Sequence, residues 1–143
     1  METAGTNDAE PWKLAVVVRD DLATWQRLNV TAFVVSGIGT LHPQLIGVPY
    51  ADASGQQYLR MFVNPVLVFA GDAAAIRRAF NRSLERGLPV AVYTDDLFAT
   101  GNDPDNRAAV AAATTTDLIL AGFAVAGERR AVDKALDKLR LHT

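Results

Sequence analysis

Cysteine is absent from this chain of 143 residues, and only two residues are histidine. Without cysteine the chain can have no disulfide framework, no thiolate metal site and no cysteine nucleophile. The histidines, His42 and His142, lie far apart in the sequence, and His42 belongs to a proline turn. No serine has a histidine and a carboxylate in a recognisable motif around it. We therefore expect no Ser-His-Asp arrangement, and we assign no metal or cofactor to the chain.

Long apolar runs and an excess of positive charge are also missing. The longest apolar run, residues 118–127, is far shorter than the roughly 20 residues that cross a bilayer. Acidic residues precede the first apolar run, unlike the basic start of a secretory signal. The formal net charge of −2 argues against an extended surface for nucleic acid, which depends on clustered Lys and Arg. These features predict a soluble, cytoplasmic protein that binds no membrane and has no large surface for nucleic acid, and they leave room for a small local basic patch.

The length and the hydrophobic content of 50% predict one globular domain with a sizeable core. Residues 1–11 mix Gly, Asn, Thr and acidic residues without periodicity and end in Pro11, which is typical of a disordered tail. We therefore predict a tail over residues 1–11 and a single domain over residues 12–143.

Buried strands and amphipathic helices alternate along this domain. Continuous apolar runs predict strands at residues 14–18, 66–69, 87–94 and 118–125, with a further extended segment at 58–62. Helices are expected after Asp21, from Asp72 to Arg86, over residues 107–113 and over residues 128–141. The order predicts an α/β fold, a three-layer α/β/α sandwich around a mixed, mostly parallel central sheet of four or more strands.

The first helix is predicted to bury one apolar face and to end at a pair of glycines, Gly37 and Gly39. Asp20 or Asp21 is a candidate for its N-terminal cap. Steps of three and four place its buried face at Leu22, Trp25, Leu28, Ala32 and Val35.

Two apolar surfaces predict a homodimer. Residues 61–69 are apolar but bent by Asn64 and Pro65, which suits an edge strand, and an apolar edge needs a cover. Residues 107–113 are rich in alanine and offer a smooth helix surface. A second copy of the chain is expected to bury one or both.

Polar side chains gather where two of the predicted strands end. Thr94, Asp95 and Asp96 follow the strand at residues 87–94, and Arg19 and Asp20 follow the first strand. In an open α/β sheet, ligands bind outside the carboxyl ends of the strands. If the two strands are parallel neighbours, both groups lie at one edge and within reach of each other.

We predict a cleft at this edge that also includes Asn29 and Thr100. Asn29 interrupts an apolar helix face, so its amide is either a structural link or a ligand contact. The acidic residues at the edge are open to several readings: they could cap helices, supply a general base or hold a divalent metal through oxygen.

Several segments in this order resemble the peptidyl-tRNA hydrolase II fold family. Within it the chain is most similar to a branch catalogued as domain of unknown function two thousand. The resemblance covers residues 13–141. The segments that carry it are Leu14 to Val18 with Arg19-Asp20-Asp21-Leu22, Leu28-Asn29-Val30, His42-Pro43-x-Leu45-Ile46-Gly47, Gly87 to Asp95, and Val132-Asp133-Lys134-x4-Leu139-Arg140-Leu141.

The resemblance implies half of a hydrolase site. The hydrolases open their first helix with a Gly-Lys-Gly-Lys stretch that carries a catalytic lysine, whereas residues 24–29 here contain neither lysine nor glycine. Arg27 lies in this stretch, but a guanidinium stays protonated and cannot transfer a proton at neutral pH. The Val-Thr-Asp of the hydrolases is matched by Tyr93-Thr94-Asp95.

Three hypotheses about function follow, and the sequence leaves open whether the chain is an enzyme. The first is a binding or regulatory domain that takes a small polar ligand in the strand-end cleft, through Arg19, Asp20, Asn29, Asp96 and Thr100. The second is a hydrolase of an ester such as peptidyl- or aminoacyl-tRNA, with Asp95 and Thr94 as catalytic residues and Asp95 activating water. The third is a structural subunit whose cleft is filled by its own side chains.

Overall fold

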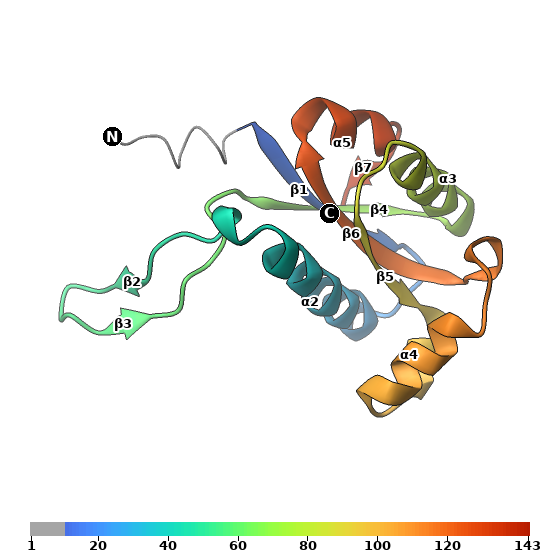
Figure 1. Ribbon diagram of the computed structural model, residues 1–143, viewed down its shortest axis with the longest axis horizontal. Coiled ribbons are helices and arrows are strands. Elements are labelled where there is room, and N and C mark those ends of the chain that lie inside the picture. The colour runs from blue at the N-terminus through green and yellow to red at the C-terminus, as the bar shows by residue number, and fades with distance from the viewer. Residues whose placement is uncertain (1–10) are drawn as a thin grey trace.

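A five-stranded mixed sheet, in the order β5-β6-β1-β4-β7, forms the centre of the computed structural model, which describes residues 11–143 (Figure 1). Its strands are β1 (Trp12–Arg19), β4 (Val66–Gly71), β5 (Val90–Thr94), β6 (Leu120–Glu128) and β7 (Arg140–Leu141). The helices are α2 (Thr24–Leu41), α3 (Ala73–Glu85), α4 (Asp103–Ala111) and α5 (Arg129–Ala135). Short 3-10 turns cover Pro43–Leu45, Asp95–Ala99 and Thr115–Asp117. Apart from Pro11, the tail expected over residues 1–11 lies outside the described residues.

The expectation of a mostly parallel sheet is wrong, because the sheet is mostly antiparallel. Only β1 and β4 pair in parallel, whereas β6 pairs antiparallel with both β1 and β5, and β7 pairs antiparallel with β4. After β5 the chain passes through α4 without crossing to the other edge of the sheet. β6 therefore starts at the edge where β5 ends and runs in the opposite direction. β1, β4 and β5 still share one direction, and their carboxyl ends meet at one edge.

Helices cover both faces of the sheet. On one face, the β1 side chains Leu14, Val16 and Val18 share a core with Val30 and Val34 of α2. On the other, alternate β1 residues pack with the apolar side chains of α3 and α5: Ala15, Val17, Ile76, Ala79, Phe80, Val132 and Leu136. Figure 1 shows α2 on the opposite side of the sheet from α3 and α5. The continuous apolar runs of β1 and β6 therefore mark strands covered on both faces, as the sequence indicated.

The buried face predicted for the first helix is wrong for Trp25, Leu28 and Ala32, although Leu22 is buried and Val35 packs against the core. The helix buries Val30, Val34 and Ile38, whereas Trp25 and Leu28 are 61% and 67% exposed. Apolar residues occur all around this helix, so spacing alone allows more than one inward face, and the packing against β1, β5 and β6 selects between them.

The two glycines of α2 do not end the helix, and Gly37 permits close packing against β5. A Cβ atom at Gly37 would lie 3.0 Å from the Cβ of Ala91 in β5, and the helix continues to Leu41. Its N-terminal cap is Ala23, whose N–H donates to Oε1 of Gln26 at 2.9 Å, so the caps expected at Asp20 or Asp21 are not used.

The expectation for α3 is confirmed. Asp72 accepts a hydrogen bond from the N–H of Ala75 at 2.8 Å, and Gly87 follows the helix with a φ of 72°, a conformation that favours glycine. The last helix is shorter than expected, because α5 ends at Ala135 and β7 returns the chain to the sheet.

The segment expected at a sheet edge separates into two parts. β4 is not an edge strand, because it lies between β1 and β7. The preceding residues form an arm, residues 47–63, with a small hairpin of β2 (Tyr50–Ala51) and β3 (Gln57–Tyr58). All residues from Val48 to Met61 are exposed, and Figure 1 shows the arm extending away from the sheet.

Candidate functional site

Arg19 and Asp95 form a two-pronged ion pair at the edge where β1 and β5 end. Nη1 and Nη2 of Arg19 donate to Oδ1 and Oδ2 of Asp95 at 2.7 and 3.1 Å. The predicted proximity of these two strand ends is therefore confirmed, although the strands are not neighbours. β6 lies between β1 and β5, and Nη1 of Arg19 also donates to the carbonyl oxygen of its first residue, Leu120, at 2.8 Å.

The guanidinium of Arg19 is fully engaged. Its Nε donates to Oδ1 of Asp21 at 2.6 Å, and the side chain is only 12% exposed. The hydrogen bonds to Asp95 raise the pKa of Arg19 above its ordinary value, against the opposing effect of burial. An arginine with every nitrogen occupied in this way links three segments of the chain and has little capacity left for a ligand.

The other residues predicted at this edge do not converge on one cleft. Thr94 is 2% exposed, and its Oγ1 is buried without a hydrogen-bond partner among the described residues. Asp20 and Asp96 are exposed, and neither lines a pocket among the described pockets. The ion pair and the predicted ligand contacts are therefore separate features.

Asn29 and Thr100 do line a pocket, next to the end of β5. It lies between α2 and residues 97–106 and has a volume of about 340 Å³. Its complete lining is Trp25, Asn29, Phe33, Tyr93, Leu97, Phe98, Thr100, Gly101, Asn102, Asp103 and Asn106. We call it the Tyr93 pocket.

Aromatic rings build one wall of the Tyr93 pocket. The ring of Tyr93 lies 5.0 Å from that of Phe98 and 5.8 Å from that of Phe33, and Trp25 meets Phe98 edge to face at 5.9 Å. Such tilted and edge-to-face arrangements are the favoured geometries of aromatic pairs. Trp25 and Phe33 remain 61% and 54% exposed, so this wall is open to a ligand.

Neutral polar groups line the remainder of the pocket. Nδ2 of Asn29 donates to the hydroxyl oxygen of Tyr93 at 3.4 Å. Burial raises the pKa of Tyr93 above its ordinary value of 10.0, and the hydrogen bond from Asn29 partly opposes this. The phenol is therefore protonated at neutral pH, and its own hydrogen has no acceptor among the described residues. Tyr93 is only 4% exposed, and neither its hydroxyl hydrogen nor Oδ1 of Asn29 makes a further hydrogen bond within residues 11–143.

Thr100 and Asn102 shape the loop of the pocket. Oγ1 of Thr100 donates to the carbonyl oxygen of Leu97 at 3.0 Å and contacts Oδ1 of Asn106. Asn102 caps α4 by accepting a hydrogen bond from the N–H of Asp105 at 2.9 Å. The only acidic lining residue, Asp103, is paired with Arg107 at 2.7 Å. The pocket therefore offers aromatic surface and neutral hydrogen-bonding groups, without an unpaired charge.

Two kinds of site are not found in the part of the chain that the structure describes. No group of three His, Asp or Glu side chains lies close enough together to hold a metal ion. Within residues 11–143, no helix is long and apolar enough to cross a membrane.

The sequence interpretation did not identify Tyr93, Phe33, Phe98 and Asn106 as lining residues. Successive side chains of a strand point to opposite faces, so Tyr93 and Thr94 could not both face one cleft. This alternation was the available signal for Tyr93. The spacing of apolar residues in the first helix indicates a core position for Trp25, and Asn106 lies in a loop segment without a pattern.

The chain is similar to proteins whose function is not known. The family described as "Protein of unknown function (DUF2000)" matches residues 12–143. A solved structure of a protein of unknown function from Agrobacterium tumefaciens strain C58 is 40% identical and superposes with a TM-score of 0.90, over 93% of this chain and 98% of the other. None of the curated proteins compared with the chain matches it.

Proposed function

Because this chain belongs to the DUF2000 family, whose function is unknown, its own geometry must indicate its role, and we propose that it is a binding domain for a small, uncharged polar ligand. The Tyr93 pocket carries this proposal. It lies outside the carboxyl end of β5, in the place where α/β folds bind ligands, and its volume of about 340 Å³ is within the range of small-molecule sites.

The lining indicates the chemistry of the ligand. Open aromatic faces of Trp25 and Phe33 favour a flat, apolar portion, and the Tyr93 hydroxyl with the Asn29 amide favours a carbonyl or amide edge. An ionised ligand would lose its hydration without meeting a free counter-charge, because Asp103 is already paired with Arg107.

The hydrolase alternative has less support. Both carboxylate oxygens of Asp95 accept hydrogen bonds from Arg19, and Thr94 is buried away from any substrate. A scaffold like that of peptidyl-tRNA hydrolase II remains our proposal for the origin of the fold, based on the segments that carry the resemblance.

We also propose that the chain forms a homodimer. The arm exposes Val48, Leu59, Met61 and Val63, and a two-stranded hairpin is marginally stable by itself. A second copy that packs on the arm would remove these side chains from water.

Trp25 makes the binding proposal testable by fluorescence. The chain has two tryptophans, and only Trp25 lines the pocket. We would titrate nicotinamide and uracil as uncharged flat probes, with nicotinate as the charged counterpart of nicotinamide. We expect saturable quenching by at least one uncharged probe, weaker binding of nicotinate, and no response in Trp25→Phe.

Two tyrosine variants form the matched comparison. Tyr93→Phe removes one hydroxyl from the pocket and should weaken binding about three- to tenfold, the usual effect of one hydrogen bond. Tyr50→Phe removes an exposed hydroxyl from the arm and should leave binding unchanged. The proposal would be contradicted if the parent, Tyr93→Phe and Tyr50→Phe bound with equal affinity, or if neither uncharged probe gave saturable binding.

A further inference from the structure

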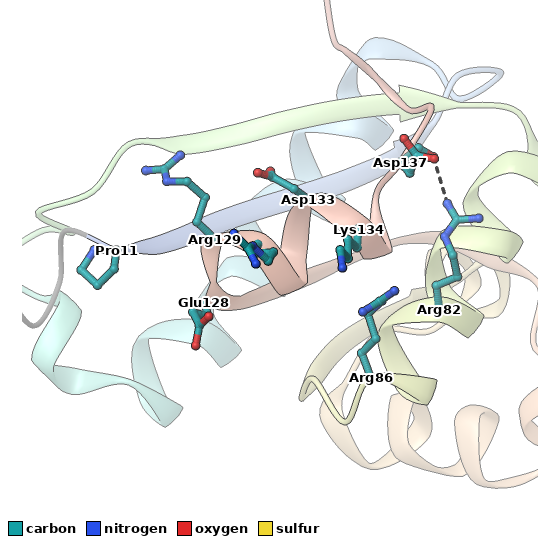
Figure 2. Close-up of a pocket in the computed structure, with 9 residues that line it drawn as sticks. Pro11, Arg82, Arg86, Glu128, Arg129, Asp133, Lys134 and Asp137 are labelled. Carbon is teal, nitrogen blue, oxygen red and sulfur yellow. Dashed lines mark hydrogen bonds between the residues drawn. The ribbon is translucent and has the colours of Figure 1, made fainter.

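A second, larger hollow lies on the opposite face of the sheet from α2. It runs between the end of α3 and α5 and has a volume of about 990 Å³ (Figure 2). Its lining consists of Pro11, Arg82, Arg86, Glu128, Arg129, Arg130, Asp133, Lys134 and Asp137. Five of these residues are cationic and three are acidic, in a chain whose formal net charge is −2. We call it the basic groove.

Some charges of the basic groove are already engaged in the fold. Nζ of Lys13 donates to Oδ1 of Asp133 at 2.5 Å, so this carboxylate does not neutralise a cation of the groove. Arg82 donates to the backbone oxygens of Ala135 and Asp137 at 2.9 and 3.0 Å, the second of which Figure 2 marks. Arg82 thus holds the end of α5 against α3 and makes a fixed wall of the groove.

The other cations of the groove have no side-chain partner in the described part of the chain. Arg86, Arg129, Arg130 and Lys134 are exposed and make no hydrogen bond or ion pair through their side chains within residues 11–143. Figure 2 shows Arg86 and Lys134 extending toward each other from the two helices. Like charges so arranged repel one another, and a bound anion would relieve that repulsion.

The spacing of the cations is regular. Arg82 and Arg86 are four residues apart on α3 and its C-terminal cap, and Arg130 and Lys134 are four residues apart on α5. Residues at this spacing lie on one side of a helix, with Cβ atoms roughly 5–6 Å apart. Each helix therefore presents two positive charges to the groove, at a separation that suits neighbouring phosphate groups.

We propose that the basic groove binds a small molecule with two or more phosphate groups. Guanidinium groups bind phosphate oxygens through paired hydrogen bonds, and four cations from two facing helices can neutralise several negative charges at once. Glu128 and Asp137 border the same groove, and they would repel the long phosphate backbone of a nucleic acid. A compact anion avoids them.

This site is separate from the Tyr93 pocket. Arg86 of the basic groove precedes β5, whereas the Tyr93 pocket lies at the carboxyl end of β5. The helices of the two sites also cover opposite faces of the sheet. Uncharged probes test one site and anions test the other, so each proposal can fail without the other.

Titration with inorganic pyrophosphate at low ionic strength tests the proposal. Calorimetry should give saturable binding, with inorganic phosphate weaker and added salt reducing the affinity. Amide chemical shifts should move at residues 82–86 and 128–137 and stay unchanged at residues 93–106. No saturation up to about 10 mM pyrophosphate, or shifts that map elsewhere, would overturn the proposal.

A charge-matched pair of variants separates a site from general attraction. Arg86→Gln with Lys134→Gln removes two groove cations, and Arg78→Gln with Arg140→Gln removes two exposed cations outside it, so both proteins change from −2 to −4. The groove variant should bind pyrophosphate roughly tenfold or more weakly, and the control within about twofold of the parent. An equal loss in both variants would overturn the proposal.

Discussion

Arg19 at the end of β1 and Asp95 just after β5 are joined by hydrogen bonds of 2.7 and 3.1 Å across the first residue of β6. The pair ties together two strands that are not neighbours in the sheet. Asp95 also begins the 3-10 turn that leads into residues 97–106. The ion pair therefore positions the loop of the Tyr93 pocket. This structural role explains why Arg19 and Asp95 lie at the strand ends without assigning either residue to a reaction.

The first prediction concerns the strength of this pair. A double-mutant cycle with Arg19→Met and Asp95→Ala should give a coupling energy of about 1–2 kcal/mol in urea unfolding, because the guanidinium is mostly shielded from water. The exposed pair of Arg107 and Asp103 is the control, with about 0.3–0.5 kcal/mol expected for a helix pair. Equal coupling energies in the two cycles would refute a special role for Arg19 and Asp95.

The second prediction is that the purified protein releases little or no peptide from peptidyl-tRNA. Residues 24–29 contain no lysine, and Asp95 is engaged by Arg19. A lysine-bearing peptidyl-tRNA hydrolase of the family that the sequence resembles serves as the positive control in a release assay. A comparable rate that is abolished by Asp95→Asn would favour the hydrolase alternative.

The third prediction is a loss of stability at alkaline pH that depends on Tyr93. Burial raises the folded-state pKa of Tyr93 above 10.0, so its contribution to stability is complete below pH 10.0 and is lost as pH rises through the folded-state pKa. Urea unfolding at several alkaline pH values should show a shallower decline in Tyr93→Phe.

Tyr58 provides the comparison for that measurement. Its pKa is also raised, but by the hydrogen bond to Asp52 on the exposed arm. Solvent screens an exposed interaction, so Tyr58→Phe should retain most of the decline. If Tyr58→Phe abolishes the decline and Tyr93→Phe does not, burial of Tyr93 is not its cause.

The fourth prediction concerns a close backbone contact in β6. A Cβ atom at Gly122 would lie 2.4 Å from the carbonyl oxygen of Val17 and 2.8 Å from a methyl group of Val30. The carbonyl oxygen of Val17 belongs to the backbone of β1 and cannot move aside as a side chain could. Gly122→Ala should therefore destabilise the protein by about 1–3 kcal/mol or more. Gly101→Ala meets nothing within 4 Å and should change stability little. Similar unfolding midpoints for the two variants would contradict this account of the packing.

The fifth prediction tests the proposed homodimer. Light scattering in the micromolar range should give twice the mass of one chain. Leu59→Lys places a charge on the most exposed apolar side chain of the arm, 87% exposed, and should shift the mass toward that of the monomer. Ile119→Lys, at an exposed apolar position outside the arm, is the control. A monomer mass for the parent at every concentration would rule the dimer out.

Local chemistry explains what could be predicted about α3 and the strands. The cap at Asp72 and the stop at Gly87 depend on residues that are neighbours in sequence, and the structure confirms both. The runs in β1 and β6 indicated strands buried on both faces, because an apolar side chain on either face needs a cover. None of these local patterns indicates whether a strand pairs with its neighbours in parallel or antiparallel.

The sequence by itself determined the α/β class, the limits of α3, the carboxyl end of β5, and the polar strand ends that carry Arg19 and Asp95, because capping, turn formation and apolar periodicity act over a few neighbouring residues. Only the tertiary structure decided that β6 lies antiparallel between β1 and β5, which face of α2 is inward, and that Tyr93 lines the pocket whereas Thr94 does not. These outcomes depend on contacts between segments far apart in the chain. Gly37 shows the difference: its sequence context indicates a helix end, but the approach of β5 to within 3.0 Å of a Cβ at that position makes it a packing residue inside the helix.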